Sequence, residues 1–236
     1  MPRLGTKELL SKNISVPTLE EQKRIVRILD KINSLISFRK QQLATLDKLA
    51  KARFLEIFGN PIENSGQLPT KMLGTVCLLK AGITTPADAI HDYDEEHQIP
   101  CYGGNGIRGY VKESTQHGIY PIIGRQGALC GNLQLAQGDF HATEHAVLVT
   151  PLEKINIYWL FYLLKYMDLY RYHTGAAQPG LAVKTLNKVD IPVADLGQQN
   201  KFSTFVEKID RQKLTIQQSL DKLEILKKIL MQKYFR

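Results

Sequence analysis

The fold is decided by residues 18–59, TLEEQKRIVRILDKINSLISFRKQQLATLDKLAKARFLEIFG. No glycine or proline interrupts the stretch before Gly59, and its apolar residues recur at spacings of three, four and seven. They are Ile25, Ile28, Ile32, Leu35, Ile36, Leu43, Leu46, Ala50 and Ile57. These spacings place apolar side chains on one face of an α-helix. Because Gly59-Asn60-Pro61 is a strong stop signal, we predict one long helix over 18–59.

The C-terminal segment, residues 196–236, repeats this pattern. A shift of 177 positions aligns residues 7–59 with 184–236 without gaps and gives 14 identical pairs in 53 positions. Each copy opens with a short apolar piece that ends in proline, Ile14–Pro17 in the first and Val189–Pro192 in the second. We interpret the two segments as a duplication. Its period is too long, and its copies too few, for a solenoid.

Two helices of roughly 38 residues would each be about 57 Å long, which exceeds a compact domain of this size. Each carries a single apolar stripe, so the helices must cover each other or a partner. The favoured arrangement is an antiparallel coiled coil. Polar residues interrupt the middle of both stripes and leave room for a third partner: Ser37, Arg39, Lys40, Gln41, Gln42, Gln212, Lys213, Gln217 and Gln218. The alternative is that both helices pack on the central segment.

Residues 60–195 are expected to form a mixed α/β domain with a small sheet, preceded by a lead-in segment at 1–17. Short apolar runs at 119–123 and 146–149 lie between glycine-rich turns, which is typical of strands. A helix is predicted over 156–170. The predicted fold class is therefore α+β, with one such domain and two long helices.

Composition excludes several classes of protein. Of the 236 residues, 43% are hydrophobic and 23% charged, as in soluble globular proteins. No apolar run approaches the roughly 20 residues of a membrane span, and the N-terminus lacks the apolar core of a signal peptide. Three cysteines without a Cys-x-x-Cys pair argue for reduced thiols and against a zinc ribbon. We therefore expect a cytoplasmic protein.

The net charge of +8 is unevenly placed. Residues 60–183 hold 8 Lys and Arg against 11 Asp and Glu, whereas the remaining residues hold 23 against 12. The basic excess lies in the terminal segments and suits an acidic partner such as nucleic acid. The acidic residues of the centre concentrate at 88–96, which is typical of a solvated loop.

Two motifs resemble catalytic signatures but lack their context. Gly104–Gly109 fits G-x-G-x-x-G, but the apolar residues after it predict a strand rather than the helix that binds a phosphate. His141–His145 fits H-x-x-E-H, which binds zinc only on a helix, and a strand would hold the two histidines about 13 Å apart. We therefore expect no catalytic residue and no metal site.

Several strings together resemble the specificity subunit of type I restriction–modification systems, over nearly the whole chain. They are Ile14–Ile25, Phe58-Gly59-Asn60-Pro61, Ile99–Tyr110, Ile123–Ala128, and Gly175–Leu181 leading to Ile191-Pro192. The family alternates target-recognition domains with conserved helices. This chain matches a helix, a domain and a helix. Residues 194–199 depart from the pattern because they lack the counterparts of Glu20 and Glu21.

The resemblance implies a non-catalytic reader of one half of a bipartite double-stranded DNA target. Its helices would dock modification subunits that methylate adenine, and a restriction translocase-nuclease subunit would join them. S-adenosylmethionine, ATP and Mg²⁺ are then expected on the partner subunits, with no cofactor on this chain. A homodimer of two chains reading a symmetric site is a further expectation.

The candidate DNA-binding residues follow from base-edge and phosphate chemistry. Asn, Gln, Arg and Tyr on loops held by a rigid sheet can read bases, and Lys can hold phosphates. The candidates are Tyr102, Asn105, Arg108, Tyr110, Lys112, Arg125, Gln126 and Lys184. Because the central segment is net acidic, we expect weak DNA binding by the chain alone. The alternatives are a coiled-coil interaction scaffold without DNA specificity, and an enzyme that uses the glycine-rich loops.

Overall fold

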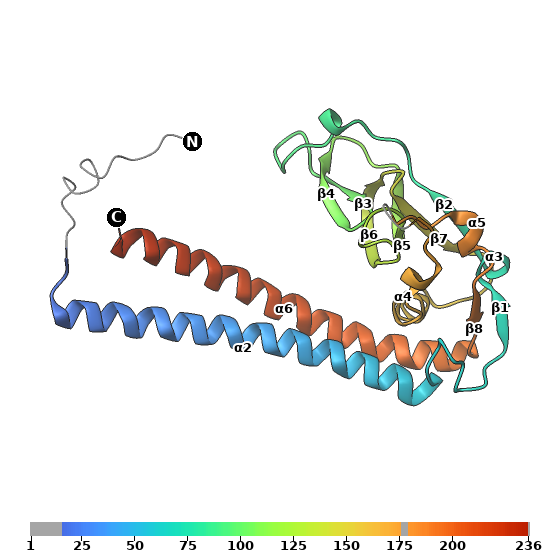
Figure 1. Ribbon diagram of the computed structural model, residues 1–236, viewed down its shortest axis with the longest axis horizontal. Coiled ribbons are helices and arrows are strands. Elements are labelled where there is room, and N and C mark those ends of the chain that lie inside the picture. Colours follow the sequence, from blue (N-terminus) through green and yellow to red (C-terminus); the bar gives the residue numbers. More distant parts are fainter. Residues whose placement is uncertain (1–15, 176–178, 236) are drawn as a thin grey trace. The chain divides into compact units, whose positions relative to one another are not determined.

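The computed structural model describes residues 16–175 and 179–235 and divides the chain into two compact units. One unit contains residues up to 46 and from 211 onward, and the other contains residues 47–210. The expected α+β class, with two long helices and one small-sheet domain, is confirmed (Figure 1). The predicted lead-in at 1–17 falls almost wholly outside the described residues.

Both long helices form as expected. Helix α2 spans Leu19–Phe58 and helix α6 spans Leu196–Tyr234. At the start of α2, the Glu21 N–H donates to Thr18 Oγ1 (3.3 Å) while the Thr18 N–H donates to Glu21 Oε2 (3.2 Å). This reciprocal pair is a capping box. Helix α2 ends where Gly59 takes a φ of 75°, a left-handed conformation that favours glycine.

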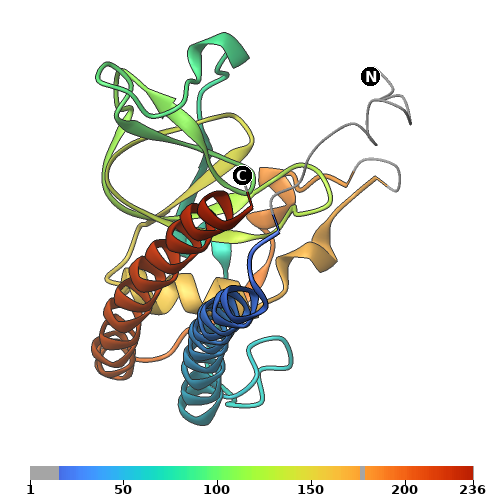
Figure 2. The same ribbon diagram turned by 90° about the vertical axis from the view of Figure 1, so that its left-hand side faces the viewer.

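In the first unit, α2 and α6 lie side by side as an antiparallel pair (Figures 1 and 2). Ile32, Ile36 and Leu220 are buried between them, and Leu43 and Leu223 are among the partly buried residues that pack on this cluster. Lys40 Nζ lies 3.0 Å from Glu224 Oε1 across the pair. The predicted coiled coil is confirmed.

The second unit is built on a six-stranded sheet with strand order β2-β7-β5-β6-β3-β4. Its strands are β2 (Cys77–Ala81), β3 (Ile99–Gly103), β4 (Gly106–Val111), β5 (Gln116–Gly124), β6 (Leu133–Ala142) and β7 (Ala146–Pro151). All neighbours are antiparallel except β3 and β6, which are parallel. A separate two-stranded sheet pairs β1 (Thr70–Met72) with β8 (Asp190–Pro192).

Short helices complete this unit: α3 (Leu73–Val76), α4 (Ile157–Tyr166), α5 (Val183–Leu186), η1 (Ala87–Ala89) and η2 (Leu169–Tyr172). The helix predicted over 156–170 is therefore shorter than expected. Asn156 caps α4 by accepting the N–H groups of residues 158 and 159. The chain leaves the α-helix after Met167, because Asp168 has a φ of 50° and starts the 3₁₀ turn η2.

Aromatic side chains join the ends of both long helices to α4 within the second unit. The Phe54 ring lies 5.3 Å from Phe202 and 5.2 Å from Tyr166, both edge-on. Phe58 contacts Phe202 and Trp159 in the same way. Such edge-to-face pairs are the favoured geometry of aromatic packing, so this cluster holds α2, α4 and α6 together.

All three cysteines are buried and free. Burial raises the pKa of the Cys77 thiol to about 12, so this thiol stays protonated and unreactive near neutral pH. In the part of the chain that the structure describes, no helix is long and apolar enough to cross a bilayer.

Candidate nucleic-acid interface

Two glycine-rich loops that connect strands of the six-stranded sheet meet each other. One is the turn between β3 and β4, and the other, residues 124–132, connects β5 to β6. A Cβ atom on Gly124 would lie 1.8 Å from the backbone oxygen of Gly104, which no side chain permits. The Gly131 N–H donates to the Gly124 carbonyl at 2.7 Å, which closes the second loop on itself. Glycine is therefore required where the loops touch.

Two further segments bond to these loops through the backbone. The Arg125 N–H donates to the His145 carbonyl (3.0 Å), in the turn between β6 and β7. The Leu181 N–H donates to the Arg125 carbonyl (2.8 Å), and the Gly127 N–H to the Pro179 carbonyl (2.9 Å). Residues 102–108, 124–132, 143–145 and 179–181 together form what we call the loop cluster. It is a rigid platform because main-chain hydrogen bonds fix each member.

Four of the sequence-predicted residues belong to the loop cluster, three in the two glycine-rich loops and Arg108 in the first part of β4. Asn105, Arg108 and Gln126 are exposed, and Arg125 is half-buried. The Asn105 Oδ1 accepts a hydrogen bond from Asn132 Nδ2 at 2.7 Å, which fixes the orientation of its amide. The Gln126 amide has no hydrogen-bond partner among the described residues. These side chains combine the donor and acceptor types that read base edges in the major groove.

An open groove of about 410 Å³ runs between the two glycine-rich loops. We call it the loop groove. Its side-chain walls are Asn105, Gln126, Ala128, Leu129 and His145, and Gly104 and Gly127 keep it open. Glycines beside polar side chains allow another molecule to approach the backbone closely.

Tyr102 and Tyr110 are less available than their sequence positions suggested. Tyr102 packs edge-on against the buried Phe140 ring, and burial raises the pKa of its hydroxyl. Tyr110 packs under Tyr93 of the acidic loop, with ring centroids 5.1 Å apart. Both rings contribute to packing, as aromatic residues in sheets usually do.

The acidic loop at 88–97 does not extend freely into solvent, although most of its side chains are exposed. His91 and Tyr110 exchange backbone hydrogen bonds of 3.0 and 2.8 Å, which tie the loop to β4. Glu96 forms an ion pair with Lys112, and this bond lowers the pKa of the glutamate. The loop therefore neutralises one of the lysines predicted to hold a phosphate.

Lys184 lies apart from the loop groove, on α5. Together with Lys188 and Tyr172 it lines a separate hollow of about 300 Å³. Lys188 follows Lys184 by four positions, just beyond the end of α5 at Leu186, and both side chains line the hollow. Sequence reasoning missed Lys188, although this spacing was visible.

Sequence reasoning also missed the network around Glu144. Thr85 Oγ1 bonds to His141 Nε2 (2.7 Å), and the Thr85 N–H donates to Glu144 Oε2 (3.2 Å). His145 Nε2 lies 3.1 Å from Glu144 Oε1. Burial acts to raise the pKa of Glu144, but backbone donors and the charges of His145 and Arg108 outweigh it and lower the pKa.

The H-x-x-E-H string is thus neither a helix nor, as predicted, one strand. Strand β6 ends at Ala142, and residues 143–145 form the turn into β7. No group of three His, Cys, Asp or Glu side chains able to hold a metal occurs among the described residues. The string instead supports the structure of the loop cluster. The sequence feature that could have revealed this role is the position of the string between two apolar stretches, which is typical of a turn.

The chain combines a mixed sheet that carries polar loops with two long repeated helices. The family model described as the type I restriction modification DNA specificity domain matches residues 1–48 and 69–225. The chain belongs to this family. It is 40% identical over 206 residues to the specificity subunit of the type I restriction enzyme EcoprrI from Escherichia coli. The aligned region covers 82% of this chain and 49% of that protein.

Solved structures share the fold. The S subunit of a type I restriction–modification system from M. genitalium matches 93% of this chain and 62% of that one, with a TM-score of 0.74 and 17% identity. The HsdS subunit from Thermoanaerobacter tengcongensis matches with a TM-score of 0.52 and 18% identity, over 100% of this chain and 63% of that one. The chain spans about half the length of its EcoprrI relative.

Proposed function

We propose that this chain is a non-catalytic reader of DNA sequence that acts in the cytoplasm within a type I restriction–modification complex. Its loop cluster reads one half of a bipartite target, and its helices dock adenine-methylating modification subunits. The observation that supports this best is that Asn105 and Gln126, from two separate loops, line one groove. Arg125 lies in the same loop as Gln126, and Arg108 follows the other loop in β4. Phosphate contacts position a protein on DNA, but base-edge donors and acceptors of this kind specify sequence.

The test is Arg108→Ala in the complete complex, with methylated sites read by methylome sequencing. Arg108 is exposed, so the fold should tolerate the change, and Arg27→Ala on the exposed face of α2 is the control. We expect relaxed choice at one position of one half-site with assembly intact, since a base contact by arginine is worth about 1–3 kcal/mol. Loss of assembly with unchanged site choice would favour the scaffold alternative. Heat stabilisation of the chain by S-adenosylmethionine alone would favour an enzyme.

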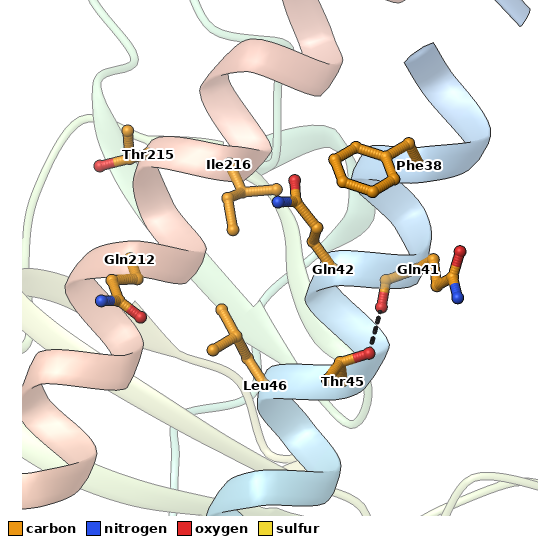
Figure 3. Close-up of a pocket in the computed structure, with 8 residues that line it drawn as sticks. All are labelled: Phe38, Gln41, Gln42, Thr45, Leu46, Gln212, Thr215 and Ile216. Atoms are coloured by element: carbon orange, nitrogen blue, oxygen red, sulfur yellow. Dashed lines mark hydrogen bonds between the residues drawn. The ribbon is translucent and has the colours of Figure 1, made fainter. Parts of the chain in front are cut away.

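Docking of the modification subunit is supported by a groove between the long helices (Figure 3). A cavity of about 540 Å³ opens where the polar middles of α2 and α6 meet. Phe38, Leu46 and Ile216 supply its apolar part, Phe38 remains 54% exposed, and glutamines surround it. An unfilled apolar groove with a polar rim has the make-up of a protein interface.

Phe38→Glu is expected to weaken assembly with the modification subunit about 10- to 100-fold. Covering the exposed half of the phenyl group would contribute about 1–1.5 kcal/mol, and placing a carboxylate in the contact would add a desolvation cost of about 1–3 kcal/mol. Ser37→Glu adds the same charge one residue away, outside the groove lining, and should leave affinity nearly unchanged. Affinity measured by calorimetry with purified subunits separates the two. Equal affinities for both variants would refute this docking surface.

The repeat carries a second indication of a partner at the N-terminal end of α2. In α6, Gln199 Nε2 donates to the Ala194 carbonyl at 2.8 Å, and in α2 its counterpart Gln22 donates to the Pro17 carbonyl at 2.8 Å. Gln199 is buried because its Oε1 also accepts the Asn156 N–H of α4 (2.8 Å). Gln22 is exposed.

The neighbouring positions show the same contrast. Phe202 and Ser203 of α6 are buried, whereas their counterparts Ile25 and Val26 are not, and Val26 is 55% exposed. We propose that a second recognition domain covers this end of α2 as α4 covers α6, which would give the two halves of a bipartite site.

We predict that this second recognition domain belongs to a second copy of the chain. We expect a dimer in solution, and we expect Val26→Lys to convert it to a monomer because the lysine would place a charge in the new contact. Arg24→Ala is the control, because Arg24 and its α6 counterpart Lys201 are both exposed. Light scattering measures the mass. A strict monomer, both alone and with the modification subunit, would reject the homodimer.

The chain alone is expected to bind DNA weakly, because the recognition segment is net acidic and Glu96 neutralises Lys112. Glu96→Gln should raise the affinity of the complex for DNA a few-fold. It should also steepen the dependence of log K on log salt by about one, since one more lysine can reach a phosphate. Glu95→Gln removes a neighbouring charge that has no bond to Lys112. Indistinguishable salt slopes for the two variants would show that Lys112 contacts no phosphate.

A further inference from the structure

The loop groove has a chemistry more specific than general DNA binding. Its side chains are two amides, Asn105 and Gln126, an exposed leucine at position 129, Ala128 and His145. Leu129 is 54% exposed, so its apolar side chain is available to a molecule bound in the groove. No arginine, lysine, aspartate or glutamate is among the described residues that line the groove.

Each base pair calls for different side chains in the major groove. Guanine is read by arginine or lysine, and cytosine by a carboxylate that accepts from its N4 amino group. Adenine is read by an amide that donates to N7 and accepts from N6, and thymine by an apolar group against its methyl. The lining of the loop groove provides the amide and the apolar group that read adenine and thymine. Among its described residues it has neither the basic nor the acidic side chain that reads guanine or cytosine.

We infer that the loop groove reads an adenine–thymine pair, with Gln126 on adenine and Leu129 on the thymine methyl. This inference rests on the proposed function and names the base pair that the site selects. Gln126 is suited to the adenine because its side chain is exposed and its amide makes no hydrogen bond to another described residue. Asn105 is the weaker candidate for the adenine, because its Oδ1 already accepts from Asn132 Nδ2 at 2.7 Å.

His145 forms the wall of the groove and does not read a base. Its Nε2 faces Glu144 Oε1 at 3.1 Å, and its Nδ1 is enclosed. Its backbone carbonyl accepts the Arg125 N–H, so the residue anchors the loop that carries Gln126. The contact of Gly104 with Gly124 fixes the other side. The backbone of the loop that carries Gln126 is therefore fixed before binding, which lowers the conformational entropy lost when the complex forms.

The first test changes Gln126 in the complete complex and reads the methylated motif by methylome sequencing. Gln126→Ala should relax one position, an A·T pair, about tenfold or more, and leave the other positions unchanged. Gln126→Glu should shift that position toward C·G, because a carboxylate accepts from cytosine N4 and cannot donate to adenine N7. Gln137→Ala, an exposed glutamine on β6 outside the groove, is the control.

The second test addresses the methyl contact. In the DNA target, replacing thymine with uracil at the A·T pair that the first test identifies removes only the 5-methyl group. Wild-type complex should lose affinity a few-fold on this DNA, while Leu129→Ala complex should bind both DNAs equally. Leu129 is exposed, so this variant should fold, and a cooperative melt with intact assembly would establish that it does.

The outcomes separate the inference from the function on which it rests. If both variants left a specific motif unchanged, or if the relaxed position were a G·C pair, the adenine–thymine assignment would be overturned. The proposed role of the chain as a reader of DNA sequence would still stand. The proposed function itself would be overturned if the wild-type complex methylated DNA with no sequence choice that depends on this chain.

Discussion

Gly124→Ala is expected to abolish the sequence choice contributed by this recognition domain. The new methyl group would lie 1.8 Å from the Gly104 carbonyl oxygen, far inside van der Waals contact. That oxygen belongs to the backbone, and main-chain hydrogen bonds to Gly131 and Asn132 hold the Gly124 backbone in place. The clash cannot be relieved by a side-chain rotation, so the two glycine-rich loops must separate. Asn105 and Gln126 would then lose their common groove, and methylation at the cognate half-site should fall at least a hundredfold.

Gly103→Ala is the matched control for this prediction. It adds the same methyl group one residue before Gly104, where the nearest atoms would lie 3.7 Å away, an ordinary contact. Methylome sequencing and methylation rates on a defined DNA site measure both variants. If Gly124→Ala kept full rate and motif, the loop cluster would not be the reading surface, because its geometry could not have survived the change.

The long helices could be predicted from the sequence because their determinants are local. The apolar spacing in residues 18–58, the Thr18–Glu21 capping box and the glycine at 59 act over a few residues each. The antiparallel pairing followed because each helix had a single stripe to bury. The end of α4 could not be predicted in this way, because the left-handed Asp168 is dictated by the path into the next turn.

The candidate site was predictable only in part. Asn105, Arg108, Arg125 and Gln126 were identified from glycine-rich turns with polar side chains, and the fold brings the two turns together through pairings between non-consecutive strands, β3 with β6 and β5 with β7. The network around Glu144 was missed because it depends on Thr85, which is 59 positions away. Likewise, the ion pair of Lys112 with Glu96 depends on the acidic loop folding back onto β4. Local sequence patterns can identify polar side chains that could read bases, but long-range contacts decide which of these side chains remain available to DNA.

The stability of the recognition unit is expected to depend most strongly on Phe54. This side chain is fully buried, and its ring contacts Phe58, Tyr166 and Phe202 at centroid distances of 4.9, 5.2 and 5.3 Å. Phe54→Ala would remove the aromatic contacts that join α2 to α4 and α6 and leave a cavity. The expected loss is about 3–5 kcal/mol of unfolding free energy, a large part of the 5–15 kcal/mol typical of a domain.

Leu49→Ala on the same helix is the control, because Leu49 is 48% exposed and should cost under about 1 kcal/mol. Urea unfolding followed by circular dichroism measures both variants. Phe54→Ala should lower the midpoint strongly and should impair site-specific methylation at a temperature where Leu49→Ala remains active. A loss below 1 kcal/mol for Phe54→Ala would contradict the role of this cluster in holding the recognition unit to its helices. The unit would then owe its stability to the sheet core around Ile122 and Phe140, which contains no residue of either long helix.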